Sequence, residues 1–372
     1  MKQEYDILII GAGLAGCISA MHLHPHYKVC LVDKENQNAA TCYESLVASS
    51  KRIFKELDIL DDILRLDKRI VTPSVGIKSY WAAELPQYTD SIKNPEGEGM
   101  LVDKVAFVGA LQKMVNGKGI PIGHLQLVSI MREAKGWSIT LKDHQGIKEV
   151  SAKYIIDASG RANYFRNKEG GTKENLDQLV CANAIVQTRA SQRLSIIYPD
   201  KSGWFYISPM PNEQFLVSYY TDSDLWDKAQ LISSEFVLQK LKENPVLADE
   251  LGLESMSFYQ NVGMKAAHSS TLSRVVGDDW LALGDAAMTL DPLSSAGSYN
   301  AMRSAAYLSK LLVERNFIEK RSQPENEVFQ QQVYDYYSKV WKQYTQEHLY
   351  YYSIEDRWNE EVFWARRSLV YS

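Results

Sequence analysis

Cysteine is scarce in this chain of 372 residues, and its spacing excludes a disulfide framework. The four cysteines each stand alone in apolar surroundings, at Cys17, Cys30, Cys42 and Cys181. Isolated thiols of this kind are typical of buried, reduced cysteines rather than of disulfides or metal ligands. We therefore expect a protein of a reducing, cytoplasmic compartment.

A complete set of metal ligands is also missing. The segment HLHPHY carries His22, His24 and His26, but Pro25 interrupts their spacing, and no carboxylate or cysteine accompanies them. A zinc site needs such a set of ligands. The segment is therefore predicted to be a surface loop, and no metal is expected.

Long apolar runs and an excess of positive charge are absent too. No segment approaches the ~18 apolar residues that a membrane-spanning helix needs, and no charged-then-apolar leader precedes the first strand pattern. The net charge is −5, and the largest basic cluster is the pair Arg366 and Arg367. These features favour a cytoplasmic globular protein of two joined domains, with neither a membrane nor a nucleic acid as partner.

The chain opens instead with a strand, a glycine-rich turn and a helix in direct succession. Residues 5–10 are an apolar run of strand length, and glycines follow in G-x-G-x-x-G spacing before a helix-like segment. Such glycines allow a tight bend, the close approach of a pyrophosphate and the packing of helix on strand, so that phosphates sit at the helix N-terminus. We expect nucleotide phosphates to contact Gly11, Gly13, Leu14, Ala15 and Gly16.

An acidic residue completes this nucleotide-binding motif. The second strand pattern ends at Asp33, about 20 residues beyond the glycines, where a carboxylate binds ribose hydroxyls. Asp33 and the adjacent Lys34 are therefore predicted to contact the adenosine ribose. A carboxylate at this position favours a ribose without a phosphate.

Two later segments extend the nucleotide site to an FAD site. DASGR follows a strand pattern and places Ser159 and Gly160 beside the cofactor. The buried strand pattern WLAL ends in Gly284 and Asp285, whose carboxylate can accept a hydrogen bond from a ribityl hydroxyl. A helix then begins after DPLSSAG, and its positive end suits a reduced, negatively charged flavin. Flavin contacts are expected from Pro292, Ser295, Ala296 and Gly297.

Taken in this order, the motifs resemble those of the glutathione-reductase-type flavoproteins of the aromatic-hydroxylase branch. Within that branch, they are most like the FAD-dependent halogenases and the hydroxylases related to them. The resemblance covers nearly the whole chain. By size and motif variants, the chain is most similar to the small flavoproteins that modify precursors of quinone-bearing lysine and glycine oxidases. The resemblance rests on GAGLAG, Tyr43-Glu44-Ser45, DASGR, GWFYISP at 203–209, GDAA with DPLSSAG, Arg357-Trp358 and Phe363-Trp364.

This resemblance implies a fold and an activity. The fold is α/β, with a Rossmann-like FAD-binding domain, an antiparallel β-sheet substrate domain and C-terminal helices. The activity is hydroxylation of a tryptophan in the precursor of a quinoprotein amino-acid oxidase, during cysteine tryptophylquinone biogenesis. An external electron donor or reductase is implied, because no second G-x-G-x-x-G motif is apparent. Lys104 stands where many hydroxylases have an arginine on the flavin phosphates, and it lacks the bidentate fork of arginine.

Departures from the halogenases argue against halogenation. Where tryptophan halogenases carry G-W-x-W-x-I-P, this chain keeps Trp204 but has Tyr206 and Ser208. The lysine that carries activated halogen in those enzymes falls near Ser74 here, with Lys78 further along. Both features of a halogenase are therefore incomplete.

Strand and helix patterns divide the chain into three parts. A discontinuous FAD-binding domain is predicted at residues 1–72, 97–168 and 268–324, a substrate domain at 73–96 and 169–267, and a C-terminal helical segment at 325–372. Alternating segments between residues 125 and 152 predict a three-stranded meander, and residues 226–244 predict a helix after the substrate strands.

Local predictions near the flavin leave alternatives open. Glu44 and Ser45 are expected near the start of an amphipathic helix that runs to about Leu60, either facing the flavin or with Ser45 serving as a helix cap. Trp204 and Tyr206 line the roof of a substrate cavity or pack in a core. His268 reaches the reactive edge of the flavin or bonds a backbone carbonyl.

The last segment is dense in aromatic residues, and their spacing predicts two helices. Most of these residues are expected to pack on the FAD-binding domain, and the excess leaves room for an exposed docking patch. The aromatic residues are Tyr334, Tyr336, Tyr337, Trp341, Tyr344, Tyr350, Tyr351, Tyr352, Trp358, Phe363 and Trp364.

Two other functions remain as alternatives to protein hydroxylation. One is a flavin-dependent reductase or hydroxylase of a small apolar molecule. The other is a non-enzymatic maturation factor that binds a precursor and retains FAD structurally.

Overall fold

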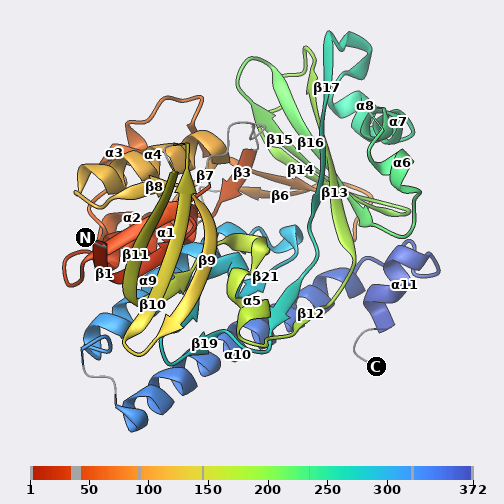
Figure 1. Cartoon of the computed structure of the whole chain (residues 1–372). Helices are drawn as coiled ribbons and strands as arrows, with labels where there is room; N and C mark the ends of the chain where they lie inside the picture. Colours follow the sequence, from red (N-terminus) through yellow and green to blue (C-terminus); the bar gives the residue numbers. More distant parts are fainter. Residues whose placement is uncertain are drawn as a thin grey trace.

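The computed structural model describes residues 3–34, 43–90, 94–144, 146–233, 235–319 and 322–369 (Figure 1). Cys17, Cys30 and Cys181 are buried free thiols, as predicted, and Cys42 lies outside the described residues. Within these ranges, no helix is long and apolar enough to cross a bilayer, and no group of His, Cys, Asp or Glu side chains is placed to hold a metal ion.

An eight-stranded sheet forms the core of the first part of the fold. Its strand β1 (Gln3–Ile10) pairs in parallel with β2 (Val29–Asp33) and with β11 (Gly146–Asp157). Residues 7–10 of β1 are all buried, as is typical of a parallel sheet that helices cover on both faces. The remaining strands are β8 (Ile122–His124), β9 (Gln126–Glu133), β10 (Gly136–Asp143), β19 (Val276–Gly277) and β20 (Trp280–Ala282).

Strand β11 takes part in two kinds of pairing. On one side it pairs antiparallel with β10, which pairs antiparallel with β9, and this confirms the predicted meander. On the other side β11 runs parallel to β1 as far as Asp157. The meander thus leads the chain directly to the edge of the sheet where the DASGR segment begins.

Two helices pack closely over the start of the sheet. Helix α1 (Leu14–Leu23) contacts α9 (Gly297–Glu314), and the hydroxyls of Ser19 and Ser309 lie 2.8 Å apart in their buried interface. His22 belongs to the last turn of α1, so the predicted histidine loop begins after it. Further helices are α2 (Ser50–Glu56), α3 (Leu60–Leu64), α4 (Lys104–Gly117) and α5 (Tyr164–Lys168).

Small sheets connect this part of the fold to the second one. One joins β3 (Tyr43–Leu46), β7 (Gly99–Asp103) and β4 (Val71–Ser74). Another joins β12 (Lys173–Asn175), β18 (Ser270–Leu272) and β21 (Met288–Thr289).

A seven-stranded sheet forms the second part of the fold. Helices α6 (Lys228–Leu231), α7 (Phe236–Lys242) and α8 (Pro245–Glu250) lie beside it in Figure 1, and their apolar residues share a separate core with it. The strands in spatial order are β17 (Phe258–Ala266), β13 (Leu179–Gln187), β16 (Gln214–Asp222), β15 (Gly203–Met210), β14 (Ser195–Asp200), β5 (Gly76–Ser79) and β6 (Gln87–Asp90).

The prediction of one helix over residues 226–244 is wrong. Helix α6 ends at Leu231 and α7 begins at Phe236. Between them, the hydroxyl of Ser233 accepts a hydrogen bond from the backbone N–H of Glu235 at 3.3 Å. A serine that binds nearby backbone competes with helical hydrogen bonding, which explains the break.

The C-terminal segment forms the two predicted helices, α10 (Gln323–Ser353) and α11 (Val362–Leu369), and Figure 1 shows α10 running toward the second sheet. The first half of α10 packs on the first core through Phe329 and Tyr337. Its end and α11 instead pack with residues of the second sheet, in a cluster that contains Trp204, Tyr352 and Trp364. The expectation that most tail aromatics pack on the FAD-binding part is therefore corrected: the tail binds both parts. Tyr350 and Tyr351 are exposed.

Candidate functional site

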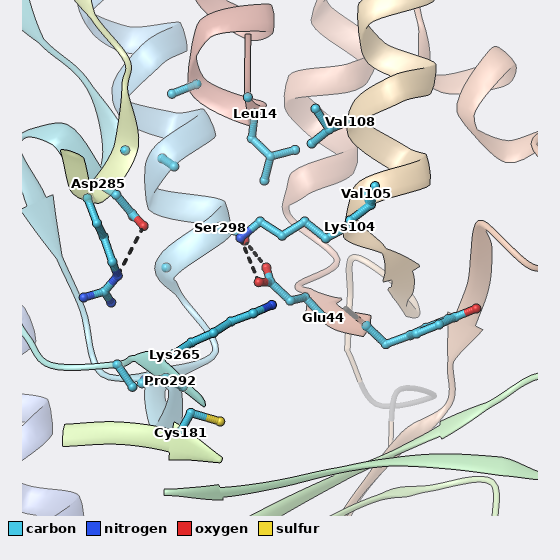
Figure 2. A pocket seen from close by; sticks show the side chains of 18 of the residues that line it. Leu14, Glu44, Lys104, Val105, Val108, Cys181, Lys265, Asp285, Pro292 and Ser298 are labelled. Atoms are coloured by element: carbon cyan, nitrogen blue, oxygen red, sulfur yellow. Dashed lines mark hydrogen bonds and ion pairs between the residues drawn. The ribbon is translucent and has the colours of Figure 1, made fainter. Parts of the chain in front are cut away.

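A cavity of about 1340 Å³ lies between the two parts of the fold. One wall carries the glycine turn, β3, α4 and the start of α9, and the opposite wall is made by strands β13, β15, β16 and β17 (Figure 2). Small-molecule pockets typically measure about 300–1,000 Å³, so this cavity has room for more than one ligand. The predicted residues that line it are Gly13, Leu14, Ala15, Asp33, Lys34, Glu44, Ser45, Lys104, Gly160, Tyr206, Asp285, Pro292, Ser295 and Gly297.

The three glycines of the first turn have different surroundings. Gly11 has a φ of +99°, and a Cβ there would lie 2.3 Å from the carbonyl oxygen of Ala158. A Cβ on Gly16 would lie 2.0 Å from the carbonyl oxygen of Gly11, whereas one on Gly13 would meet no protein atom within 4 Å. Gly11 and Gly16 therefore permit backbone packing, and Gly13 presents bare backbone to the cavity.

Asp33 supports the glycine turn and also faces the cavity. Its carboxylate accepts hydrogen bonds from the backbone N–H groups of Ala12, at 3.2 Å, and Lys34, at 2.9 Å. The Gln112 side chain donates to the Ala12 carbonyl at 2.9 Å and fixes the turn from the other side. A carboxylate has about four acceptor sites, so Asp33 retains capacity for sugar hydroxyls.

Glu44 and Ser45 lie in strand β3, and the prediction that they begin a helix is wrong. β3 pairs antiparallel with β7, with Tyr43 and Leu46 buried at its two ends. The helix α2 starts later, at Ser50, so Ser45 is not its cap. Strand pairing with a segment more than fifty residues away overrode the local amphipathic pattern. Both residues still line the cavity.

The Glu44 carboxylate joins three elements across the cavity wall. It accepts hydrogen bonds from the Lys104 ammonium at 2.7 Å and from the Ser298 hydroxyl at 2.6 Å, as Figure 2 shows. Burial alone would raise the pKa of Glu44, but Lys104 and Ser298 stabilise the anion and leave this pKa below its ordinary value. Lys104, which was predicted to contact the flavin phosphates, lies at the start of α4 and is held there by the carboxylate of Glu44.

Asp285 and Arg161 lie side by side in the cavity wall (Figure 2). The Arg161 Nε lies 4.0 Å from a carboxylate oxygen of Asp285, and its Nη1 donates to the His268 carbonyl at 2.9 Å. Burial raises the pKa of Asp285, although Lys104 and Arg161 oppose the rise. Arg161 was not predicted as a site residue. Its place as the last residue of the DASGR motif, directly after Gly160, could have indicated it.

The start of α9 points an open N-terminus at the cavity. Its N-cap residue is Ala296, which has no side-chain group to cap the helix, and Ser295 before it adopts a left-handed φ of +48°. Pro292, Ser295 and Gly297 line the cavity around this end. An uncapped helix N-terminus attracts negative charge through its free N–H groups and its dipole.

The second sheet provides the opposite wall. Tyr206 and Tyr220 face the cavity. Two polar residues of the same wall are joined to each other, since the Ser218 hydroxyl donates to the side-chain oxygen of Asn183 at 2.7 Å. Lys265 extends into the cavity from β17 in Figure 2. Apart from Tyr206, these residues were not predicted, because nothing in a single strand pattern shows which sheet face meets a cofactor.

Several predicted residues do not line the cavity, namely Gly11, Gly16, Ser159, Trp204, His268, Gly284 and Ala296. Trp204 is buried and stacks on Tyr220, with ring centroids 4.0 Å apart, so it packs beside the cavity on the same sheet face, under Tyr352. The Ser159 hydroxyl donates to Asp157 at 2.6 Å. The His268 ring lies 3.2 Å from the Lys173 ammonium, and burial together with the charges of Lys173 and Arg161 lowers its pKa to about 4.

The FAD-binding domain family matches residues 4–316 of the chain. The chain belongs to this family. LodB of Marinomonas mediterranea, described as an FAD-dependent oxidoreductase, is 27% identical over 372 residues, which cover 98% of this chain and 97% of LodB. The protein is therefore an FAD-dependent oxidoreductase of the group that contains the monooxygenases and halogenases.

Similar solved structures establish the fold. The flavin-dependent halogenase CmlS superposes with a TM-score of 0.83 at 17% identity, covering 100% of this chain and 69% of CmlS. The peptidyl tryptophan dihydroxylase QhpG, essential for tryptophylquinone cofactor biogenesis, superposes with a TM-score of 0.72 at 18% identity, covering 98% of this chain and 78% of QhpG. The predicted α/β fold with an FAD-binding domain and C-terminal helices is confirmed.

The cavity wall suits FAD in three places: the bare backbone at Gly13, the carboxylate of Asp33 and the open N-terminus of α9.

Asp33→Ala is expected to weaken FAD binding, since it removes a charged acceptor whose hydrogen bonds are each worth about 1.5–3 kcal/mol. Fluorescence titration of apoprotein with FAD measures the loss. The control is Asp143→Ala. Asp143 also ends a strand and its carboxylate accepts a hydrogen bond from a backbone N–H, that of Gly146, but it lies outside the cavity. Equal affinities in both variants would move the ribose contact elsewhere.

Proposed function

We propose that this protein is a monooxygenase that hydroxylates a tryptophan in the precursor of a quinoprotein amino-acid oxidase, as a step of cysteine tryptophylquinone biogenesis. The observation that carries the proposal is the two-sided cavity, in which FAD-fingerprint residues face an aromatic and polar wall that includes Tyr206 and Tyr220. The likeness to the peptidyl tryptophan dihydroxylase QhpG supports a tryptophan in a protein as the substrate.

FAD, reduced by an external donor or reductase, supplies the oxygen-transfer chemistry when bound. The residues of the chain bind and orient the reactants. The N-terminus of α9 would hold the flavin and would stabilise negative charge on its pyrimidine end. Tyr206 and Tyr220 present ring faces and edges to an indole, and aromatic pairs prefer offset or edge-to-face contacts. Because bound FAD would supply an electrophilic oxygen donor for an electron-rich indole, a strong general base is not required of the chain.

The residues near the halogenase lysine position favour oxygen transfer over halogenation. Lys78 forms an ion pair with Glu250, which also accepts a hydrogen bond from the Tyr80 hydroxyl at 2.7 Å. Lys78 does not line the cavity, and Ser74 lies in β4. In this arrangement Lys78 is bound to a carboxylate rather than presented to a substrate.

We also propose that the two hydrophobic cores correspond to two domains. The main core gathers residues of 1–72, 97–168 and 268–324 together with tail residues such as Phe329 and Tyr337, and the second core gathers residues of 73–96 and 169–267. Residues 325–372 then act as a helical tail across both domains. The cavity between the cores is where a cofactor and a substrate meet.

The proposal is tested with the precursor of a quinoprotein oxidase encoded beside this protein. Incubation of that precursor with the flavoprotein, a flavin reductant and oxygen should add oxygen to one tryptophan, seen by mass spectrometry of the digested precursor. Tyr206→Ala should reduce the yield while the flavin spectrum stays nearly unchanged, because Tyr206 lies on the wall opposite the cofactor fingerprint.

Two outcomes would replace the proposal. Efficient turnover of a small apolar molecule, with the precursor neither bound nor modified, would favour the reductase or small-molecule hydroxylase. Maturation of the precursor with Asp33→Ala protein that retains no FAD would favour a non-enzymatic factor.

A further inference from the structure

A buried carboxylate anchors the loop that precedes α9. Asp291 is 1% exposed, and its Oδ1 accepts a hydrogen bond from the Leu293 N–H at 2.8 Å. Its carbonyl accepts another from the Ser294 hydroxyl, also at 2.8 Å. Asp291 therefore fixes the backbone of the segment whose Pro292, Ser295 and Gly297 line the cavity.

The last turns of α10 hold this carboxylate. The hydroxyl of Tyr352, itself 2% exposed, donates to Asp291 Oδ2 at 2.9 Å, and the Tyr344 hydroxyl accepts from the Asp291 N–H at 3.0 Å. The His348 Nε2 lies 3.4 Å from Asp291 Oδ2. One face of α10, at positions 344, 348 and 352, thus surrounds a single aspartate more than fifty residues away in the chain.

Tyr352 also contacts the wall on the substrate side. Its hydroxyl accepts a hydrogen bond from Trp204 Nε1 at 3.0 Å, and Trp204 stacks at 15° on Tyr220, which lines the cavity. The ring of Tyr352 packs among Trp81 and Trp364. Phenylalanine would serve that packing equally well, and a buried hydroxyl is unfavourable unless it is hydrogen-bonded. The hydroxyl of Tyr352 therefore has its role in the bonds to Asp291 and Trp204.

We propose that Tyr352 is a positioning residue for the flavin: through Asp291 it fixes the 292–297 loop and the start of α9, and through Trp204 it aligns the opposite wall. The proposal rests on the placement of FAD against the start of α9. It assigns to the aromatic tail a role at the cofactor, in addition to its packing.

Tyr352→Phe tests this role because it keeps the ring and removes the hydroxyl. FAD affinity should fall by about two- to thirtyfold, as for other substitutions within a coupled network. At saturating FAD, the visible absorption bands and the midpoint potential of the bound flavin should also shift, because the N-terminus of α9 is no longer held in place. Asp291→Asn should give the same signature, and the double variant should be no worse than the more affected single variant.

Tyr219→Phe is the matched control. Tyr219 is also fully buried and donates its hydroxyl to an aspartate, Asp200, at 2.8 Å, but it lies in the second core and not on the cavity. It should lower the melting temperature with no change in the flavin bands or potential. The proposal is overturned if Tyr352→Phe behaves like this control, or if the effects of Tyr352→Phe and Asp291→Asn simply add. If wild-type protein binds FAD but neither Asp33→Ala nor Gly13→Ala weakens the binding, the placement of FAD along this cavity fails, and the proposal fails with it.

Discussion

Gly16→Ala is expected to destabilise the fold, whereas Gly13→Ala is expected to leave the apoprotein stable and impair only FAD binding. The Cβ of an alanine at position 16 would lie 2.0 Å from the Gly11 carbonyl oxygen, so β1 and α1 must separate. Overpacking a core typically costs about 1–3 kcal/mol, and a clash between two backbone segments lies at or above the upper end of that range. At position 13 the added methyl group meets no protein atom within 4 Å.

Thermal unfolding of apoprotein and titration with FAD separate the two effects. Gly16→Ala should lower the melting temperature by several degrees and lose FAD as a consequence. Gly13→Ala should melt like the wild type and bind FAD at least tenfold more weakly, because a methyl group then stands where a phosphate approaches. Normal FAD affinity in Gly13→Ala would show that the pyrophosphate does not lie on this turn.

Arg367→Ala is expected to destabilise the protein far more than substitution of its neighbour Arg366. The Arg367 side chain is 3% exposed and makes two hydrogen bonds to Asp222, at 2.7 and 3.0 Å, which is 2% exposed. Its removal takes both short hydrogen bonds from the buried Asp222 carboxylate and leaves it only the longer contact with Arg366 Nη1, at 3.3 Å. Breaking a buried ion pair in this way typically costs about 3–5 kcal/mol. Arg366 is 39% exposed and pairs mainly with Asp224 at the surface, so Arg366→Ala should cost about 0–1 kcal/mol.

Urea unfolding of the two arginine variants measures this difference. Comparison of the two variants also tests whether α11 unfolds together with the rest of the protein, because Arg367 lies on α11 and its partner Asp222 ends β16. Similar free energies of unfolding for both variants would mean that α11 detaches before the rest of the protein unfolds.

The FAD-binding half was predictable because its signals are local. The spacing of the glycines, the strand before them and Asp33 after the next strand all lie within one short βαβ unit. The same reasoning was wrong for Glu44 and Ser45. Their strand forms only because β7 lies beside it, and a local amphipathic pattern carries no information about such a partner.

The substrate wall was predictable in part. Trp204 and Tyr206 do share one face of β15, opposite Tyr220 and Ser218 of β16, as strand alternation requires. However, Trp204 is covered by Tyr352 and the tail, which lie 148 residues further along the chain. The sequence could place the two aromatics on one face, but only the tertiary structure shows that the tail covers one end of that face.

The cavity draws its residues from positions 13 to 301, and its loop at 292–297 is held by a tyrosine at position 352. A ribosome makes a chain from its N-terminus at about 5–20 residues per second, so the glycine turn emerges long before most of the residues that close the site around it. The site therefore cannot close fully around the cofactor before residue 352 has been made. Nascent chains that stop before residue 300 should not retain FAD, so loading of the cofactor follows the synthesis of α9 and α10.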